Sequence, residues 1–575
     1  MDKIERLITW AKDHGAILTS NVEFKEISPN NYGSVSTSYD PVVIEIPRSL
    51  VITSDQAVSL FGKESFDKST NRLALLKLYL SHSRIDESSF YKPYIDALPS
   101  LEAIDSPYTW PPEDRAYIQG TNLGNSLNEN LASIIEEWWY ALNLIPEGIT
   151  KPTEHFINMK FYYEYKFYND TDLYKYLNET ATSNWTAFPN YLWSSLIFKS
   201  RAFPAYIIDK NFPKNEVMLL PVVDLLNHSP SAKVTWSSGG NEEFRFETDE
   251  PVAKGCEIFN NYGLKGNEEL LLAYGFALEE NNSDSVALKI KVPKSMIEKI
   301  EAKGIKLPTI DDYTNSVLDK EGKTESSHEH GILFFITLTN FPENLKQVFE
   351  MLVQNSWEKG LTLRMKLAGL NHLRAALEVK RKMLQLNVPA DSTRRKYIKS
   401  YITSQDKILS SAITCIKRQE KELLSQFKTH LITLKNVYKK DKRFQQSLLF
   451  LGFNDFETIL ESEFQDQCWL LWLIRCYNKS SYTKEPEEDN YLPDWIQNLF
   501  RQLRRDTEIT TQDVLNFKPI HDNLVPQLIS SVPEIYGVGD WSIGEFVIAA
   551  KLLDRISFVR GKDQECIIVE QEYQT

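Results

Sequence analysis

The stretch Leu219–Phe276 limits the folds open to this chain more than any other, because two apolar runs within it each lead into polar groups. The first run ends in Asn227-His228, and the second ends three residues before Tyr262. Another tyrosine, Tyr274, follows twelve residues later. A buried tyrosine hydroxyl needs a hydrogen-bond partner, and Asn and His supply donors and acceptors. The pattern therefore predicts a polar pocket inside an apolar wall, the usual form of a small-molecule site.

This stretch resembles the SET-domain protein methyltransferases, in the branch typified by Rubisco large-subunit lysine methyltransferase and the fungal ribosomal-protein lysine methyltransferases. The resemblance depends on Asn227-His228-Ser229 together with Tyr262 and Tyr274, because neither part is specific alone. It implies an α+β fold. Short β-strands with a helical insertion would form the SET domain, and an all-α C-terminal substrate-binding domain would follow.

The length of 575 residues is too great for one ordinary domain, and two or three are expected. The resemblance implies a SET domain over 1–295 with a helical insertion at about 55–198. A helical substrate-binding domain would follow over 296–480, and a C-terminal helical extension over 481–575.

Hydrophobic periodicity supports this division. Apolar residues at helical spacing predict long helices over 364–386 and 394–424, with a solvated basic face as the simplest reading of the lysines and arginines between them. Short β-rich runs predict strands, which fall at 22–27, 42–46, 50–52 and 286–292.

Composition excludes several classes of function. No apolar run reaches the about 18–20 residues of a membrane span, and the N-terminus lacks the pattern of a signal peptide. The five cysteines are scattered without a Cys-x-x-Cys pair, which favours a reducing compartment and disfavours a structural zinc cluster. The net charge of −14 disfavours a general nucleic-acid binder.

Residues 200–203, Ser-Arg-Ala-Phe, carry a second part of the resemblance, since plant Rubisco methyltransferase has the same four letters. By this match, Arg201 should contact the carboxylate of the methyl donor and the substrate, a task that suits a bidentate guanidinium. Without the family context, a surface arginine would be the better reading. Phe203 implies a lysine substrate, because family members that methylate histidine have Asn at the matching position.

The donor-binding turn differs from the family's pattern. The family has Glu-Gly-x-Gly-Leu, where this chain reads Asn30-Asn31-Tyr32-Gly33-Ser34, so only Gly33 is kept. Asn tolerates positive φ nearly as well as Gly, so the turn can survive the change. Gly33 and Ser34 are the predicted donor contacts here.

The reaction implied is methyl transfer from S-adenosyl-L-methionine to a lysine amine, with no metal ion. By resemblance, Tyr262 is the catalytic tyrosine beside the donor methyl and also a donor contact, and Asn227 and His228 hold the donor. Tyr274 directs the amine, and Asp224 lines the substrate side. Taken singly, each would be an ordinary core residue, and only the joint pattern makes that reading improbable.

The predicted function is a protein-lysine N-methyltransferase acting on a large-subunit (60S) ribosomal protein. One alternative keeps the chemistry and changes the target to cytochrome c, an elongation factor or a histone. Another is a non-catalytic SET module that only binds a partner, which the altered turn favours and the intact Arg201, Tyr262 and Tyr274 oppose. The chain is expected to be a monomer with a protein substrate, without direct nucleic-acid or membrane contact. A cytoplasmic location is expected, with a nuclear pool as an open alternative.

Overall fold

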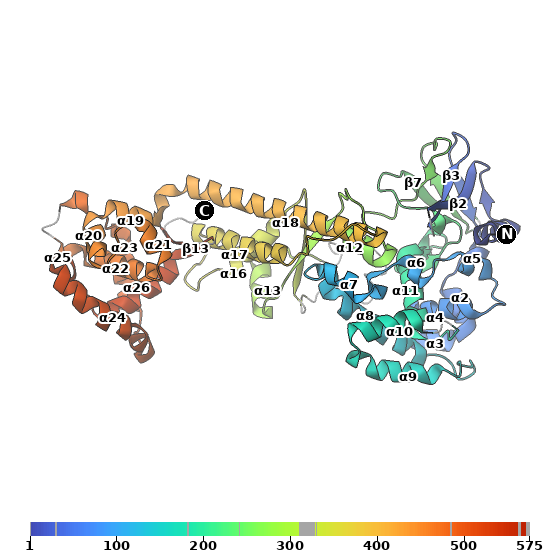
Figure 1. Ribbon diagram of the computed structural model, residues 1–575, viewed down its shortest axis with the longest axis horizontal. Coiled ribbons are helices and arrows are strands. Elements are labelled where there is room, and N and C mark those ends of the chain that lie inside the picture. Colours follow the sequence, from blue (N-terminus) through green and yellow to red (C-terminus); the bar gives the residue numbers. More distant parts are fainter. Residues whose placement is uncertain are drawn as a thin grey trace. The chain divides into compact units, whose positions relative to one another are not determined.

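A computed structural model describes residues 2–28, 31–180, 183–240, 242–309, 328, 331–482, 486–561 and 565–570. The chain divides into two compact units, which are described separately (Figure 1). Unit 1 comprises Met1–Ile297, Leu307–Phe341 and Lys380–Ser410, and unit 2 comprises Glu298–Lys306, Pro342–Val379 and Ser411–Thr575. The boundaries expected from the sequence, after residues 295 and 480, remain predictions.

Unit 1 contains several small antiparallel sheets rather than one large one. Their orders are β1-β4-β8-β7, β2-β3-β9, β5-β6 and β10-β11. The strands are β1 Ile17–Leu18, β2 Val22–Ser28, β3 Asn31–Ser36, β4 Val43–Ile46, β5 Ala202–Pro204, β6 Val217–Leu219, β7 Val234–Ser238, β8 Phe244–Thr248, β9 Glu257–Ile258, β10 Ser285–Ile290 and β11 Ile332–Thr337.

Most helices of unit 1 lie between β4 and β5 in the sequence, as the predicted insertion requires. The helices of unit 1 up to residue 269 are α1 Lys3–Asp13, α2 Ser54–Phe61, α3 Lys63–Lys68, α4 Arg72–Ile85, α5 Lys92–Ala97, α6 Leu101–Ile104, α7 Pro112–Arg115, α8 Asn122–Asn143, α9 His155–Glu164, α10 Asp170–Glu179, α11 Phe188–Arg201 and α12 Asn267–Glu269. Figure 1 shows the insertion helices gathered to one side of the strands β2, β3 and β7.

Helices α4 and α11 form the centre of the insertion. Every residue from Phe188 to Phe198 of α11 is buried, as expected of a helix that is apolar on all sides. Where the two helices meet, the hydroxyls of Ser81 and Ser194 lie 2.8 Å apart, so the buried polar atoms are paired. This enclosed helix ends at Arg201 and leads directly into β5, which gives Arg201 a rigid support.

The two apolar runs singled out in the sequence lie side by side in unit 1. Strand β6 pairs with β5 in the register Phe203↔Met218, and the chain then continues to Asn227 and His228. Strand β9 pairs with β3 and continues to Asn260, which forms a parallel bridge with His228. Residues far apart in sequence are therefore joined by backbone hydrogen bonds at one point.

In the described part of the chain, β10 is followed by four further helices before residue 427, and three of them, α13, α17 and α18, contain residues of both units. The four helices are α13 Lys294–Ala302, α16 Glu343–Leu352, α17 Leu363–Lys382 and α18 Thr393–Gln426. The predicted long helices at 364–386 and 394–424 are thus confirmed as α17 and α18. Tyr401 and Ile416 of the predicted apolar stripe on α18 are fully buried.

Unit 2 ends in a helical bundle built around Trp469 and Trp472, which are fully enclosed. Its helices are α19 Leu434–Lys440, α20 Lys442–Phe450, α21 Phe456–Glu461, α22 Gln465–Tyr477, α23 Asp494–Asp506, α24 Thr511–Ser531, α25 Pro533–Tyr536 and α26 Ile543–Ile556. A three-stranded sheet, in the order β12-β14-β13, accompanies them, with strands β12 Leu431–Thr433, β13 Ser557–Arg560 and β14 Glu565–Val569.

The predicted α+β class and helical C-terminal region match this architecture, with two local differences. The small sheet of unit 2 adds strands to a region expected to be all-α, because β12 and β14 are far apart in sequence and too short to show a pattern. The strand expected at 50–52 is wrong. A 3-10 turn covers Arg48–Leu50, and only Ile52 makes a single bridge, to Leu219. Among the described residues, no helix combines the length and apolar character needed to cross a bilayer.

Candidate active site

The residues predicted for the site come together where the runs ending in His228 and Asn260 meet. The Asn260 N–H donates to the Asn227 carbonyl at 2.8 Å, and the Ser229 N–H donates to the Asn260 carbonyl at 3.0 Å. The Tyr262 N–H donates to His228 Nδ1 at 3.1 Å. One run therefore fixes the backbone of the other, and both end at the same place.

Tyr262 is held at its ring and at its hydroxyl. Its phenol donates to the Leu226 carbonyl at 2.9 Å, and its ring stacks on His228 with centroids 4.9 Å apart. Burial raises the pKa of Tyr262 to about 12, and the pKa of His228 is lowered, chiefly by burial. At neutral pH, both rings are therefore uncharged, and Tyr262 remains a hydrogen-bond donor.

Tyr274 stacks on Tyr262, with ring centroids 5.1 Å apart. It is the last residue of a π-helix, Leu270–Tyr274, and such turns are often found at functional sites. The next residue, Gly275, has a φ of 75°, and a Cβ there would lie 1.9 Å from the Ile104 carbonyl oxygen. Only glycine fits the turn that ends this helix.

Arg201 and Asp224 form the polar side of the site. Arg201 Nη1 donates to the Asp224 carbonyl at 2.6 Å and lies 3.5 Å from its carboxylate Oδ2. That Oδ2 also accepts from the Tyr94 hydroxyl at 2.9 Å. The Asp224 side chain has no solvent exposure, and burial raises its pKa above the usual value, with Arg201 as the strongest opposing influence.

Asp224 is preceded by a strained turn. Val222 has a φ of 73° and a ψ of −53°, and the Val223 N–H donates to the Pro221 carbonyl at 2.9 Å. These are the features of a γ-turn with positive φ, which is rare and especially costly for a β-branched residue. Backbone strain of this kind is concentrated at active sites, where the surrounding structure enforces it. Val222 is fully buried, which fixes the turn.

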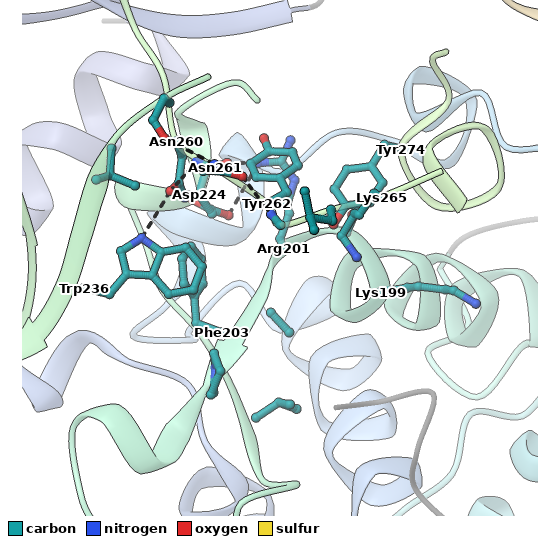
Figure 2. A pocket seen from close by; sticks show the side chains of 18 of the residues that line it. Lys199, Arg201, Phe203, Asp224, Trp236, Asn260, Asn261, Tyr262, Lys265 and Tyr274 are labelled. Atoms are coloured by element: carbon teal, nitrogen blue, oxygen red, sulfur yellow. Dashed lines mark hydrogen bonds and ion pairs between the residues drawn. The ribbon is translucent and has the colours of Figure 1, made fainter. Parts of the chain in front are cut away.

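Phe203 belongs to an aromatic wall. Its ring centroid lies 5.0 Å from that of Trp236 and 5.6 Å from that of Phe244. Figure 2 shows Phe203 and Trp236 on one side of the pocket, with Tyr262, Tyr274 and Lys265 on the other. The wall is apolar except for the Trp236 indole N–H, which donates to Asn260 Oδ1 at 3.1 Å.

These groups line a cavity of about 660 Å³, a size typical of small-molecule sites. Five of the predicted residues contribute to its lining, namely Arg201, Phe203, Asp224, Tyr262 and Tyr274. The other four, Gly33, Ser34, Asn227 and His228, are not among the lining residues, and His228 stacks on the Tyr262 ring. The prediction therefore divides into a cavity group and a second group, called the far-side group, that includes His228.

The far-side group is packed closely. Asn227 Nδ2 donates to Glu257 Oε1 at 2.7 Å, and β3 carries Gly33 past both of them. A Cβ on Gly33 would lie 2.7 Å from Glu257 Oε1 and 2.9 Å from Asn227 Nδ2. Gly33 is therefore needed for close approach rather than for positive φ. Asn30, the first residue of the altered turn, lies outside the described residues.

Buried polar atoms at the site indicate that it can bind a polar small molecule. Three buried atoms at the site lack a hydrogen-bond partner within the described part of the chain, namely Ser34 Oγ, Asp224 Oδ1 and Asn260 Nδ2. Buried polar atoms are normally paired, so orphaned atoms of this kind suggest a missing ligand. A molecule with both donors and acceptors, such as an amino acid joined to a nucleoside, suits them.

Sequence reasoning missed several residues of the site. Asn260 and Trp236 line the cavity, Tyr94 holds Asp224, and Glu257 holds Asn227. Asn260 could have been found, since it belongs to the same polar group as Tyr262. Tyr94 and Glu257 gave no signal of their own, because their partners are distant in sequence.

Comparison with known proteins gives matches over most of the chain. Residues 38–263 match the family model of the SET domain, and residues 285–427 match that of the EFM1 middle domain. Ribosomal lysine N-methyltransferase 1 of Saccharomyces cerevisiae is 31% identical over 525 residues, which cover 84% of this chain and 88% of that protein. Protein-lysine N-methyltransferase EFM1 of the same organism is 27% identical, covering 99% of this chain and 98% of that protein.

A solved structure shares the fold. Rubisco LSMT bound to sinefungin and monomethyllysine has a TM-score of 0.54 and 17% sequence identity. The alignment covers 74% of this chain and 93% of that one.

Proposed function

The chain belongs to the SET-domain protein-lysine N-methyltransferases, and we propose that the cavity bounded by Arg201 and Tyr274 is where it methylates a lysine of a ribosomal protein. The observation that carries this proposal is the stacked pair Tyr262–Tyr274, at 5.1 Å, on the wall of a single cavity. The Tyr274 hydroxyl, on a ring held against Tyr262 by this stacking, can direct an amine.

S-adenosyl-L-methionine is the cofactor of this enzyme, and when bound it supplies a methyl group on a positively charged sulfur. Gly33, Ser34, Asn227 and His228 would hold it on the far side of Tyr262. The Arg201 guanidinium suits its carboxylate, because paired N–H groups match two carboxylate oxygens.

The chain's own residues must deliver a neutral lysine amine. A lysine of ordinary pKa about 10.4 costs roughly 4–5 kcal/mol to present uncharged at pH 7. The apolar wall of Phe203 and Trp236 disfavours an ammonium ion by desolvation, and the Arg201 cation disfavours it by repulsion. Asp224 Oδ1 and the Tyr274 hydroxyl would then orient the amine, which is a proximity effect worth several kcal/mol.

A ribosomal substrate is supported by the relative with 31% identity, which is named for that class. A second candidate, a lysine on a non-ribosomal protein, is favoured by a separate observation. EFM1, named only as a protein-lysine methyltransferase, covers 99% of this chain, and the match to the EFM1 middle domain spans 285–427. The non-catalytic alternative receives no such support.

The test is methyl transfer from radiolabelled S-adenosyl-L-methionine by the purified full-length protein. Parallel reactions contain purified 60S subunits, 40S subunits and a ribosome-free cytosolic fraction, all from cells lacking this protein. Labelled bands are hydrolysed and their amino acids separated. The matched control is Tyr262→Phe, which retains the ring and loses the hydroxyl.

We expect labelled methyllysine in one 60S protein with the wild type and little with the variant. Label only in the cytosolic fraction would replace the ribosomal target with the second candidate. Labelled methylhistidine would overturn the lysine assignment. No label in any fraction, with no donor binding by calorimetry, would overturn the enzymatic function itself.

The remaining properties are proposals of the same kind. A monomer of cytoplasmic location, with a nuclear pool, suits a modifier of ribosomal proteins. The net charge of −14 opposes direct binding to nucleic acid. Light scattering at several concentrations and imaging of a tagged chain at its normal level would test the two statements separately.

A further inference from the structure

Tyr274 depends on a short segment of unusual backbone. The helix α12, Asn267–Glu269, continues without a break into the π-helix that ends at Tyr274. The wider π-helix turn is less stable than an α-helical turn, so neighbouring contacts must fix its position. The contacts of Asn267 and Glu268 are therefore relevant to where the Tyr274 hydroxyl lies.

Asn267 ties the start of this segment to the loop before β10. Its side chain exchanges two hydrogen bonds with the backbone of Leu278, at 2.9 and 3.0 Å. Its N–H donates to Asp284 Oδ1 at 2.9 Å. Gln405 of α18 donates to the carbonyl of Ser285, the first residue of β10, at 2.8 Å, so α18 contacts the chain next to Asp284.

Glu268 ties the segment directly to α18. Its Oε2 accepts a hydrogen bond from the Tyr401 hydroxyl at 3.3 Å, and Tyr401 is fully buried. One turn earlier on α18, the Tyr397 ring lies 6.4 Å from Phe276, on the other side of Tyr274 in the sequence. The first turns of α18 therefore contact the chain both before and after Tyr274.

We propose that Glu268 and Tyr401 are positioning residues, and that their hydrogen bond lets α18 hold the π-helix so that Tyr274 points at the substrate amine. This rests on the proposed function of Tyr274. It adds that residues of the segment 285–427 complete the geometry of the active site. Neither Glu268 nor Tyr401 belongs to the lining of the cavity.

The charges around Glu268 make the contact sensitive to pH. Four groups from four elements face it, namely Tyr401 of α18, Asp284 before β10, Lys380 of α17 and Lys199 of α11. Burial raises the pKa of Glu268 to about 7, and burial also lowers the pKa of Lys380. Lys380 already donates to Asn122, and Lys199 lines the cavity. Ionisation of Glu268 therefore places a charge in a buried site, where Lys380 and Lys199 offset only part of the cost of burial.

The test uses the full-length protein and the variants Tyr401→Phe and Glu268→Gln. Tyr401→Phe removes the donor, whereas Glu268→Gln keeps an acceptor and abolishes the ionisation. The matched control is Tyr162→Phe, which removes a similar tyrosine–glutamate hydrogen bond, to Glu136 at 2.7 Å in the insertion. The readouts are kcat and KM for methyl transfer, the donor Kd by calorimetry, and amide exchange by mass spectrometry.

With Tyr401→Phe, we expect kcat to fall about tenfold at unchanged donor Kd, because the amine and methyl are no longer held in line. Amides 270–276 should exchange about fivefold faster, while those of 219–230 stay unchanged. In the wild type, exchange of amides 270–276, corrected for the intrinsic pH dependence of amide exchange, should change with a midpoint near pH 7. Glu268→Gln should lack this midpoint.

Unchanged kcat and unchanged exchange at 270–276 in Tyr401→Phe would overturn the proposal. So would a loss of kcat of the same size in Tyr162→Phe, because a general loosening would then explain both. The exchange readout needs no substrate. If the wild type methylates nothing, the function fails while the coupling of α18 to the π-helix is still measured.

Discussion

At the scale of single residues, the site depends on positions where adding or removing one atom should change donor binding or turnover. Gly33 passes so close to Asn227 and Glu257 that no side chain fits. The Tyr262 hydroxyl donates to the Leu226 carbonyl, and this hydrogen bond fixes one end of the ring. Small substitutions at these two positions should therefore separate binding of the donor from turnover.

Gly33→Ala should weaken donor binding. The new Cβ would lie 2.7 Å from Glu257 Oε1 and 2.9 Å from Ile27 Cγ1, so both neighbours must move, and Asn227 with them. Overpacking of this kind costs about 1–3 kcal/mol of unfolding free energy. We expect the donor Kd to rise about tenfold by calorimetry. Gly148→Ala, where a Cβ meets nothing within 4 Å, is the control. An unchanged Kd would show that the donor does not need this approach.

Tyr262→Phe should reduce turnover while keeping the fold. Loss of the hydroxyl leaves the Leu226 carbonyl without this partner at 2.9 Å, which costs about 1 kcal/mol. The ring, still stacked on His228 and Tyr274, would no longer be fixed at its far end, and we expect kcat to fall about 100-fold. Single-turnover kinetics measure this. A rate within twofold of the wild type would contradict the assignment.

Residue identities were the most predictable part of the site. Asn227, His228, Tyr262 and Tyr274 could be named because their joint pattern along the chain resembles a known family. Tyr94 could not, since its partner Asp224 lies 130 residues away and nothing local marks the pair. The assigned roles remain predictions until the variants are measured.

At the scale of elements, the site is held by segments of irregular backbone between regular helices and strands. The γ-turn at Val222 and the π-helix Leu270–Tyr274 have no sequence signature, since they arise from tertiary contacts that override local preference. The regular helices and strands were easier to predict from the sequence. The alternation over 286–292 predicted β10, and apolar spacing predicted α17 and α18.

The helix α12 should make stability depend on pH through Glu268. Its pKa is about 7 in the folded chain against 4.5 as the ordinary value, so the folded state binds the proton more tightly. The protonated Glu268 therefore adds up to about 3 kcal/mol to the free energy of unfolding. This contribution is complete below about pH 4.5 and is lost as pH rises through about 7.

The measurement is urea unfolding of the wild type and Glu268→Gln from pH 5 to pH 8. Other titrating groups cancel in the difference between the two proteins. That difference should shift in favour of Glu268→Gln as pH rises, and a difference independent of pH would contradict the assigned pKa.

At the scale of the whole molecule, the chain has two units with separate interiors. The interior of the unit 2 bundle contains a fully enclosed ion pair, Arg475–Asp441, at 3.2 Å. The predicted donor contacts belong to unit 1. Sequence periodicity predicted the helices of both units. It could not assign 307–341 and 380–410 to unit 1, because that depends on which surfaces meet.

Asp441→Asn should destabilise unit 2 without affecting the donor site. The amide can still accept from the Phe444 N–H, which Asp441 Oδ1 caps at 3.0 Å, but it removes the negative charge that Asp441 places beside Arg475. Breaking a buried pair in this way costs about 3–5 kcal/mol. Calorimetry should show a lowered Tm and, at 20 °C, an unchanged donor Kd. A weakened Kd would mean that the two units are energetically coupled.

The turn at Val222 also bears on the order in which the chain folds. An isolated segment would avoid a φ of 73° at valine, so the turn can persist only once that side chain is enclosed by the surrounding core. We therefore expect it to form after the transition state, with substitutions there speeding unfolding and leaving the refolding rate unchanged. A nascent or partly folded copy would then lack the turn that places Asp224. The lysine site would then be completed only late in the enzyme's own maturation.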